Sequence, residues 1–204
     1  MRKRRLVQAI STSAYDAFEE RDRLFHELFG SLGKGAFLEP PFNCDYGCNT
    51  YTGDNFYANM DCIFLDVAPI TIGDRVFFGP RVGLYTPYHP IDAAVRASGP
   101  EGARPITIGS DVWFGGNVVV GPGVTIGNDV VIGAGSVVLK EVPPNSTVVG
   151  VPGIVVKRDN VRVPREDLDQ VHLPNPVMME IDRLQQENSK LRERLDELAA
   201  AVTR

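Results

Sequence analysis

Only three histidines occur in the 204 residues, and one of them, His89, stands between Tyr88 and Pro90. Pro90 restricts the backbone of His89 toward extended geometry. A neutral imidazole can take up a proton near pH 7, which is what a hydroxyl group needs in order to attack an acyl group. His89 is therefore a candidate general base, with a loop histidine that has no catalytic role as the alternative.

The three cysteines, Cys44, Cys48 and Cys62, form a small and odd-numbered set, which argues against a disulfide framework. Cys44 and Cys48 have the spacing of half a metal site, but no second pair of Cys or His residues completes four ligands. We therefore expect no metal, and we interpret the cysteines as small packing residues with reduced thiols.

The composition excludes several classes of partner. A net charge of -5 and an isoelectric point near 5.2 give no reason to expect nucleic acid, whose phosphates need a strongly basic face. The basic start at residues 2–5 precedes no apolar run of the kind found in signal peptides, and no stretch of 18 apolar residues occurs. We predict a cytoplasmic protein that does not bind membranes.

The segment 84–107, which contains His89, interrupts a six-residue repeat. Each unit carries an inward aliphatic residue, a glycine where the backbone turns, and a second small or β-branched residue. Seven units follow this pattern: IGDRVF (72–77), FGPRVG (78–83), IGSDVW (108–113), FGGNVV (114–119), VGPGVT (120–125), IGNDVV (126–131) and IGAGSV (132–137). A fixed period of six predicts a mainly β fold, a β-helix with about 18 residues in each coil.

The interruption itself is 24 residues long, which equals four units, so the chain returns to the repeat in register. Stacking alone does not explain such an insertion. Loops on rigid scaffolds are favoured places for function, and we therefore predict that 84–107 is an excursion loop that presents His89.

The segments on either side of the repeat have different patterns. Residues 1–39 are predicted to form an N-terminal helical segment, because 14–33 has helical apolar spacing and ends in glycines; this helix should pack on the coil entrance. The β-helix domain is assigned to 40–158. A proline-containing linker follows at 159–176, and a helix at 177–204.

The C-terminal helix has a heptad pattern. Its a positions hold aliphatic residues except at Asn188, and its d positions hold Val or Leu throughout. Glu187 at g can reach Arg192 at e of a partner helix, which favours a parallel coiled coil in which Asn188 sets the register. The alternative is a single amphipathic helix lying on its own domain.

Several motifs together resemble those of a known family: NCDYGCNTYTGDNFYANMDCIFLD, IGDRVFFGP, YHPIDAAVRASG and the run PITIGSDVWFGGNVVVGPGVTIGNDVVIGAGSVVLKEVPPNSTVVGVPG. They are similar to the sugar O-acetyltransferases of the hexapeptide-repeat superfamily, of the maltose, galactoside and nodulation type, from about residue 14 to 158. The resemblance implies a left-handed parallel β-helix, a homotrimer, and acetyl-CoA bound in the groove between subunits. It also implies that the excursion loop of one subunit closes a neighbour's site.

The resemblance assigns catalytic and acceptor roles to particular residues. His89 is the implied general base, and a backbone N–H near Gly116 is the implied oxyanion donor. Asp45, Asn59 and Glu101 are the implied contacts to the carbohydrate acceptor. From the residues alone, a turn residue beside Gly47 is the favoured interpretation of Asp45, and an internal ladder is the favoured interpretation of Asn59. The family pattern also includes an acidic residue in a preceding segment, and we expect this chain to begin after it, which leaves the sugar undefined.

The same resemblance assigns residues to the coenzyme. Trp113 and Ala134 match positions beside the pantetheine arm, although Trp113 is also explained as a bulky cap. Lys140 and Lys157 match positions that meet phosphates, and both are also explained as solvated surface lysines. At Gly153 relatives usually have alanine, which is a minor departure.

Three rival functions remain open at this stage. A metal-dependent hydratase similar to the γ-class carbonic anhydrases would need three histidines at one ion, whereas His26 lies in the leading helix and His172 in the linker. A related acetyltransferase could modify an antibiotic or serine instead of a sugar. A third possibility is a non-catalytic trimeric scaffold whose coiled coil is the functional part.

Deletion of residues 174–204 is expected to leave acetyl transfer intact and to change the size of the assembly, because the heptads add a contact between chains outside the repeat domain. Light scattering of the full and shortened chains measures this directly. An unchanged mass would show that the tail has no role in assembly.

Overall fold

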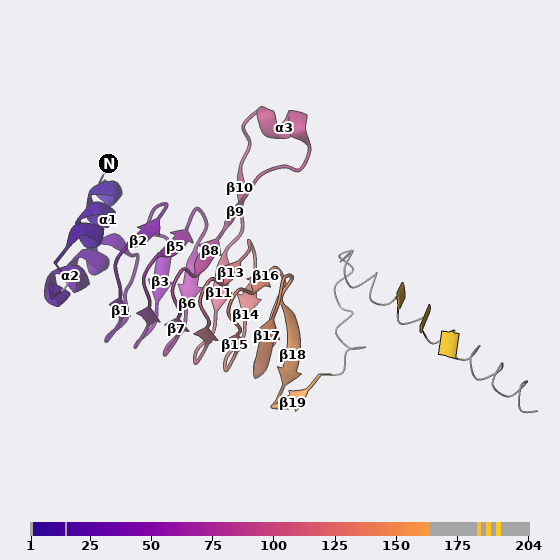
Figure 1. Cartoon of the computed structure of the whole chain (residues 1–204). Helices are drawn as coiled ribbons and strands as arrows, with labels where there is room; N and C mark the ends of the chain where they lie inside the picture. The colour runs from indigo at the N-terminus through magenta and orange to yellow at the C-terminus, as the bar shows by residue number, and fades with distance from the viewer. Residues whose placement is uncertain (1, 15, 164–182, 185–186, 189–190, 193–204) are drawn as a thin grey trace, which may run out of the picture. The chain divides into compact units, whose positions relative to one another are not determined.

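The computed structural model describes residues 2–14, 16–163, 183–184, 187–188 and 191–192. The chain separates into two compact units, Met1–Leu168 and Asp169–Arg204. The first unit is a solenoid of stacked parallel coils with two helices at its N-terminal end (Figure 1). Across the described ranges, every helix is too short or too polar to span a lipid bilayer.

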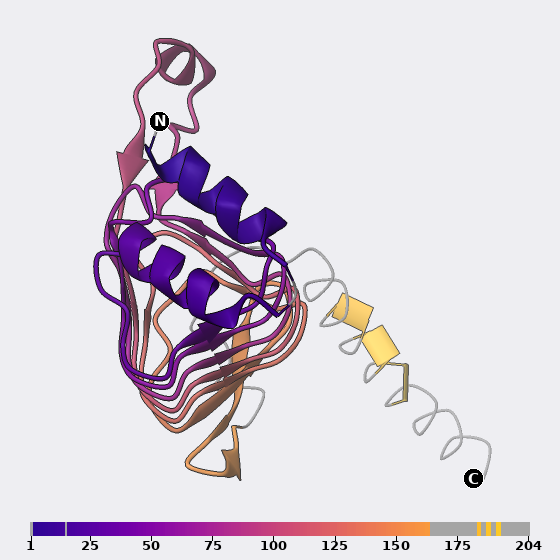
Figure 2. The ribbon, with the colours of Figure 1, turned by 90° about the vertical axis from the view of Figure 1, so that its left-hand side faces the viewer.

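The two N-terminal helices are α1 (Arg2–Thr12) and α2 (Phe18–Leu28), and they lie across the open end of the coils (Figure 2). The predicted helix is α2, which buries Leu24, Phe25 and Leu28 and packs the ring of Phe25 edge to face against that of Phe42, with centroids 5.4 Å apart. The expected packing on the coil entrance is therefore confirmed. The basic start of the chain also forms a helix, α1, because Leu6 and Ile10 give it a buried face.

Three parallel sheets run along the solenoid, and the chain visits them in turn. Sheet 1 comprises β1 (Phe37–Leu38), β4 (Tyr57–Ala58), β7 (Phe77–Phe78), β12 (Trp113–Phe114), β15 (Val131–Ile132) and β17 (Ser146–Val149). Sheet 2 comprises β2 (Phe42–Cys44), β5 (Cys62–Leu65), β8 (Gly83–Tyr85), β13 (Val119–Val120) and β16 (Val137–Val138). Sheet 3 comprises β3 (Thr50–Thr52), β6 (Ile70–Ile72), β11 (Ile106–Ile108) and β14 (Thr125–Ile126).

The strands stack in strict register, so that one residue of each coil lies above its counterpart in the next. Trp113 pairs with Val131, 18 positions on, as the repeat predicts. Phe37 pairs with Tyr57, 20 positions on, so the first coils are longer than the predicted 18 residues. We call the turns between the sheets corner 1–2, corner 2–3 and corner 3–1, after the two sheets that each turn joins. The two extra residues lie at corner 2–3.

The excursion also leaves from corner 2–3. It consists of β9 (Pro87–Tyr88), β10 (Gly102–Ala103) and, at its tip, α3 (Ala93–Ala97). The excursion is shorter than 84–107, because Leu84 and Ile106 at its two ends point inward and are fully buried in the coils. The chain nevertheless returns in register, since Gly83 pairs with Val119, 36 positions on, which is twice 18.

The core is a continuous column of inward side chains. Phe64, Phe78 and Phe114 stack edge to face, with ring centroids 5.9 Å and 4.5 Å apart. Beyond Phe114 the same positions hold the buried aliphatics Ile132 and Val148. Burial of each such side chain stabilises the fold by about 2 kcal/mol.

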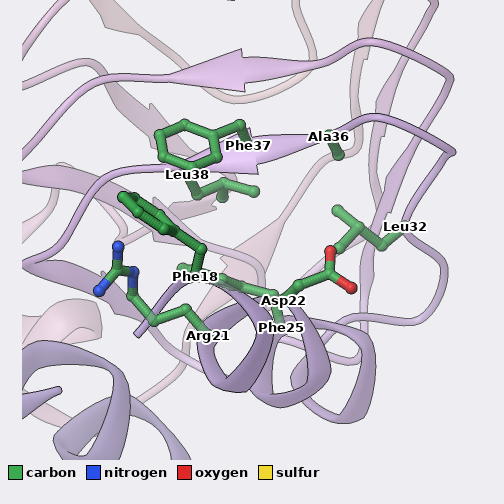
Figure 3. Close-up of a pocket in the computed structure, with 8 residues that line it drawn as sticks. All are labelled: Phe18, Arg21, Asp22, Phe25, Leu32, Ala36, Phe37 and Leu38. Atoms are coloured by element: carbon green, nitrogen blue, oxygen red, sulfur yellow. The ribbon is translucent and has the colours of Figure 1, made fainter. Parts of the chain in front are cut away.

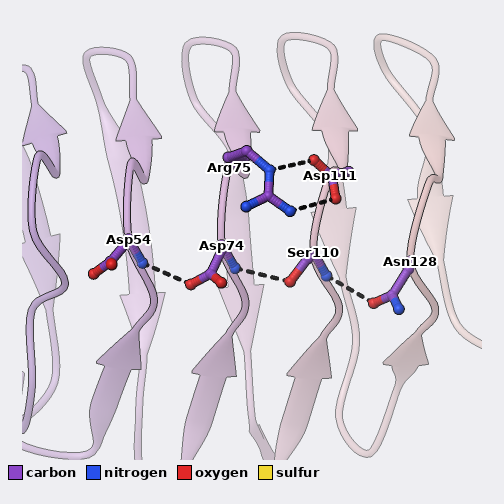
Figure 4. Close-up of polar contacts among 6 residues, drawn as sticks. All are labelled: Asp54, Asp74, Arg75, Ser110, Asp111 and Asn128. Carbon is purple, nitrogen blue, oxygen red and sulfur yellow. Dashed lines mark hydrogen bonds and ion pairs between the residues drawn. The ribbon is translucent and has the colours of Figure 1, made fainter.

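Polar side chains bind the coils together at corner 3–1 (Figure 4). Asp74 Oδ1 accepts from the Asp54 backbone N–H at 2.8 Å, Ser110 Oγ from the Asp74 N–H at 3.0 Å, and Asn128 Oδ1 from the Ser110 N–H at 2.8 Å. Each side chain therefore satisfies a backbone donor of the preceding coil, which the turn would otherwise leave unpaired.

The next position of corner 3–1 has a left-handed backbone. Asn and Asp tolerate this conformation well, and they occupy it at Asn55, Asp111 and Asp129. Arg75, with φ 53°, is neither Asn nor Asp. Arg75 instead donates two hydrogen bonds to Asp111 in the next coil, at 2.6 and 2.8 Å. The hydrogen-bonded guanidinium also holds the pKa of Asp111 below its ordinary value.

Two antiparallel strands close the C-terminal end of sheet 1: β18 (Ile154–Arg158) and β19 (Val161–Arg162). The second of these lies within the segment predicted as linker. Of the predicted heptad helix the structure describes residues 183–184, 187–188 and 191–192, all helical, with Arg183 Nη1 3.1 Å from Glu187 Oε2. The d-position leucines Leu184 and Leu191 are exposed. The coiled coil itself stays a prediction, since its other residues lie outside the described ranges.

Replacing Ser110 with alanine is expected to lower the free energy of unfolding by about 1 kcal/mol, because the Asp74 N–H loses its acceptor. Thermal denaturation followed by circular dichroism should show a fall of roughly 2–4 °C in the midpoint. The exposed Ser98→Ala serves as control. Equal midpoints for Ser110→Ala and the wild type would contradict this role of the ladder.

Candidate active site

His89 faces Glu101 across the base of the excursion. Strand β9 pairs with β10 so that Tyr88 lies opposite Gly102, which brings the next residues, His89 and Glu101, together. His89 Nδ1 lies 3.4 Å from the carbonyl oxygen of Pro100, and Nε2 lies 3.9 Å from Glu101 Oε1. A carbonyl can only accept, so a hydrogen bond at this contact needs the proton on Nδ1, and the contact favours the tautomer whose basic nitrogen is Nε2.

Local side-chain contacts determine the conformation of the two-stranded β9–β10 excursion. A Cβ at residue 102 would lie 2.5 Å from the Tyr88 ring, so glycine at this position lets the ring lie close over the backbone of β10. The guanidinium of Arg104 covers the same ring at 5.3 Å. At the tip, Asp92 caps α3 by accepting from the Val95 N–H at 2.9 Å. The sequence therefore specifies an arm that projects from the coils (Figure 1), and His89 follows directly after β9 on this arm.

Asp45 lies at the same corner as the excursion, in the turn after β2, and is half-buried. The buried carboxylate of Asp66, one coil further on, accepts from the backbone N–H groups of Tyr46 and Asn49 at 2.7 and 3.1 Å and so fixes this turn. Thr86 stands next in the column, and its hydroxyl donates to the Leu65 carbonyl at 2.6 Å. Sequence reasoning missed Asp66, although an acidic residue directly after a buried strand was a usable signal.

Asn59 and Gly116 lie at corner 1–2. The side-chain oxygen of Asn59 accepts from the Met60 N–H at 2.8 Å, so Asn59 caps its own turn and is not part of an internal ladder. A Cβ at Gly115 would lie 2.5 Å from the Ala134 backbone nitrogen, so glycine is required for stacking at 115 and not at 116. Among the described residues none accepts from the Gly116 N–H, which leaves this donor open to an oxyanion.

The outer face of sheet 1 carries the predicted coenzyme residues. Trp113 points outward and is 57% exposed; it stands in mid-sheet, so it is not a cap. Val131 and Thr147 follow in the same column, and Lys157 of β18 lies opposite Thr147. Ala134 is exposed in the adjoining corner. The outer face of sheet 1 therefore carries a positive charge, that of Lys157, at its end on the C-terminal side of Trp113.

The structure divides the predicted site residues into two groups. One group lies at corner 2–3 or on its excursion: Asp45, His89, Glu101 and Lys140. The other lies on sheet 1 or at corner 1–2: Asn59, Trp113, Gly116, Ala134 and Lys157. Sheet 2 separates the two corners, so a single chain presents the two groups of predicted site residues on different sides of the solenoid.

The cysteines differ from one another in burial. Cys62 is buried, Cys44 is half-buried and Cys48 is exposed, so the prediction that all three are packing residues is wrong for Cys48. Burial, with a smaller effect of the Asp66 charge, raises the pKa of Cys44 to about 12; burial raises the pKa of Cys62 to about 11. Within the described part of the chain, no three His, Cys, Asp or Glu side chains are grouped so as to hold a metal.

Stacked six-residue repeats with one excursion define a hexapeptide-repeat solenoid, and comparison with known proteins agrees. Residues 105–140 match the family described as bacterial transferase hexapeptide (six repeats). Galactoside O-acetyltransferase of Escherichia coli (strain K12) is 42% identical over 162 residues, which cover 79% of this chain and 80% of that protein.

Solved structures give the same result. A maltose O-acetyltransferase from Clostridium difficile 630 has a TM-score of 0.76 and 50% identity, covering 77% of this chain and 84% of that one. A hexapeptide-repeat acetyltransferase from Vibrio cholerae O1 biovar eltor, complexed with acetyl coenzyme A, has a TM-score of 0.74 and 43% identity, covering 76% and 84%. The chain belongs to the hexapeptide-repeat acetyltransferase family, and it is an acyltransferase.

At pH 8 we expect a thiol reagent to modify one cysteine of the native chain rapidly, because the raised pKa values keep Cys44 and Cys62 protonated. After unfolding, all three should react. In Cys48→Ser the rapid phase should disappear; two rapid thiols in the native wild type would contradict the assignment. The same measurement gives the thiol signal of the protein itself, which has to be subtracted in assays of coenzyme thiol release.

Proposed function

We propose that this protein transfers the acetyl group of acetyl-CoA to a hydroxyl group of a carbohydrate, with His89 as general base. The observation that carries the proposal is the position of the imidazole: on an exposed arm, its Nδ1 lies 3.4 Å from the Pro100 carbonyl oxygen and its Nε2 faces Glu101 Oε1 at 3.9 Å. The relatives named for galactoside and maltose support a sugar as the acceptor.

The residues of sheet 1 and corner 1–2 are suited to the coenzyme. The indole of Trp113 offers an apolar surface to the pantetheine arm, and Lys157, further along the same column, offers charge to phosphates. The exposed backbone at Ala134 lies between them. Lys140 lies at corner 2–3, so in this proposal it meets phosphates bound to a neighbouring chain.

The chemical step needs one base and one oxyanion donor. His89 Nε2 takes the proton of the acceptor hydroxyl as that oxygen attacks the thioester carbonyl carbon. The Gly116 N–H donates to the oxyanion, a contact that typically contributes ~3 kcal/mol to the transition state. When the carbon–sulfur bond breaks, the His89 imidazolium returns the proton to the departing thiolate, and the products are an acetyl ester and free coenzyme.

Acceptor contacts are proposed for Asp45, Asn59 and Glu101. The amide nitrogen of Asn59 and the carboxylate of Asp45 can orient hydroxyl groups by hydrogen bonding. Glu101, 3.9 Å from His89 Nε2, can bind the hydroxyl that gives up its proton and can favour the imidazolium that results.

The separation of the predicted site residues into two groups supports a homotrimer in which each site is shared. Helix α3 at the tip of the excursion has no buried residue, and Ile91 beside it is 98% exposed. Insertion between chains would bury Ile91 and bring His89 to sheet 1 of a neighbour. Cyclic symmetry then completes every site in the same way.

His89→Ala is expected to lower the turnover number at least ~100-fold, the usual scale for loss of a general base. Coenzyme thiol release with a panel of sugars, oligosaccharides, antibiotics and serine measures this, and light scattering should show an unchanged assembly. Turnover near that of the wild type would remove His89 from the mechanism, and absence of thiol release with every acceptor would favour the scaffold function.

A second experiment with His89→Ala tests whether each active site is shared between two chains. Ala134→Trp should block the coenzyme face while leaving the arm intact. Unfolding and refolding the two inactive variants as an equal mixture should restore about a quarter of wild-type activity, because a quarter of the sites then combine a sound arm with a sound face. No recovery from the mixed assembly would place His89 and Ala134 in the same chain's site.

A further inference from the structure

The outer column of sheet 1 is aromatic on the N-terminal side of Trp113. Phe77, Tyr57 and Phe37 stand in register with it, one in each successive coil. Adjacent ring centroids are 6.3 Å apart, and the rings of Phe37 and Tyr57 are parallel within 2°. Phe77 is 49% exposed and Phe37 37% exposed. The corresponding column of sheet 3 holds Tyr51, Thr71, Thr107 and Thr125.

Helix α2 extends this column by one more ring. Phe18 is 48% exposed, and its ring centroid lies 5.9 Å from that of Phe37. The two rings border a small, shallow hollow between α2 and β1, which Asp22 and the buried Arg21 also line (Figure 3). The row of rings, exposed except at the half-buried Tyr57, therefore runs from Trp113 to the end of the solenoid.

Polar groups flank the row on both sides. Corner 3–1 presents Asn55, Arg75 and Asp111, all exposed, along one side. Corner 1–2 presents Glu39 and Asn59 along the other, both half-buried, together with the exposed side chain of Met60. A strip one side chain wide, with margins that are polar except at Met60, is narrow for a broad apolar protein contact. It suits a ligand with apolar faces and polar edges, which is the character of a pyranose ring.

We propose that Phe18, Phe37, Tyr57 and Phe77 form an acceptor track that stacks the sugar rings of an oligosaccharide beyond the ring that is acetylated. This inference rests on the proposed function, because the track begins at the coenzyme residue Trp113. Two coil spacings separate Phe77 from Phe37, a length of about 10 Å that a single sugar ring does not fill. The acceptor class is therefore an oligosaccharide or glycan chain.

The position of the track also follows from the direction of the coenzyme face. From Trp113 toward the C-terminal end, the column holds Val131, Thr147 and Lys157, which suit a pantetheine arm and phosphates. From Trp113 toward the N-terminal end, it holds only aromatic residues. The acceptor must approach the thioester from the side that the coenzyme leaves open, and that side is the aromatic one.

Trp113 is the single tryptophan of the chain, so its fluorescence reports ligand binding without acetyl-CoA. We would titrate the wild type with maltotetraose, cellotetraose and chitotetraose, and with glucose and N-acetylglucosamine. For at least one series the tetrasaccharide should bind about tenfold more tightly than its monosaccharide, and Phe37→Ser should reduce that ratio about fivefold, the scale of one lost aromatic contact. Phe18→Ser should act in the same direction.

Tyr51→Ser is the matched control, since Tyr51 is an aromatic of similar exposure on sheet 3 and should leave the ratio unchanged. Circular dichroism checks that each variant is folded, and light scattering gives its mass. Equal affinity for tetrasaccharide and monosaccharide in every series would overturn the track. So would a smaller assembly in Phe37→Ser, because the rings would then contact a second copy of the chain.

The binding readout separates this inference from the proposed function. Tetrasaccharide binding that depends on Phe37 supports the track even if no acetyl transfer follows, and in that case the proposed function fails. Acetyl transfer to a monosaccharide at the same kcat/KM as to the corresponding tetrasaccharide overturns the track and leaves the proposed function intact.

Discussion

Parallel hydrogen bonding between successive coils is the interaction on which the rest of this structure depends. Each strand donates to the coil that follows it, and the side chain on the inner face then packs on its counterpart, as Phe78 does on Phe114. A slip of one position would turn the buried column outward and the exposed one inward. The register is therefore strongly specified, and every residue on an outer face occupies a defined place in a column.

The same constraint decides where the chain can depart from its repeat. At corner 3–1, side chains such as those of Asp74 and Ser110 accept hydrogen bonds from backbone N–H groups of the preceding coil. An insertion at this corner would break these hydrogen bonds. Corner 1–2 is packed so closely that residue 115 must be glycine. Corner 2–3 alone accommodates extra residues, and it carries both the turn of Asp45 and the arm of His89. The carboxylate of Asp66 compensates for the irregular backbone there.

In the proposed function, the active site forms where the outer face of sheet 1 of one chain meets the projecting arm of another chain. One side of the chain offers a flat column that changes from aromatic side chains at Phe37 to a cation at Lys157. Another side offers a projecting arm with a basic nitrogen. Neither surface is a closed site, because a solenoid of stacked coils has no deep cleft of its own, and a second chain is needed to place the arm against the column.

Much of this could be predicted from residue order alone. The period of six, the inward aliphatics and the in-phase excursion depend on contacts between equivalent positions of neighbouring coils, so the sequence by itself determined the solenoid, the place of the arm and the candidacy of His89. The coil length near Phe37, the role of Asp66 and the exposure of Cys48 were not predictable, because they depend on which corner absorbs extra residues. Only the tertiary structure decided that Asn59 and Gly116 lie on a different side from His89 and that Phe18 joins the aromatic row. Those relations depend on the three-fold turn of each coil and on helix packing at the end, and residues far apart in the chain contribute to both.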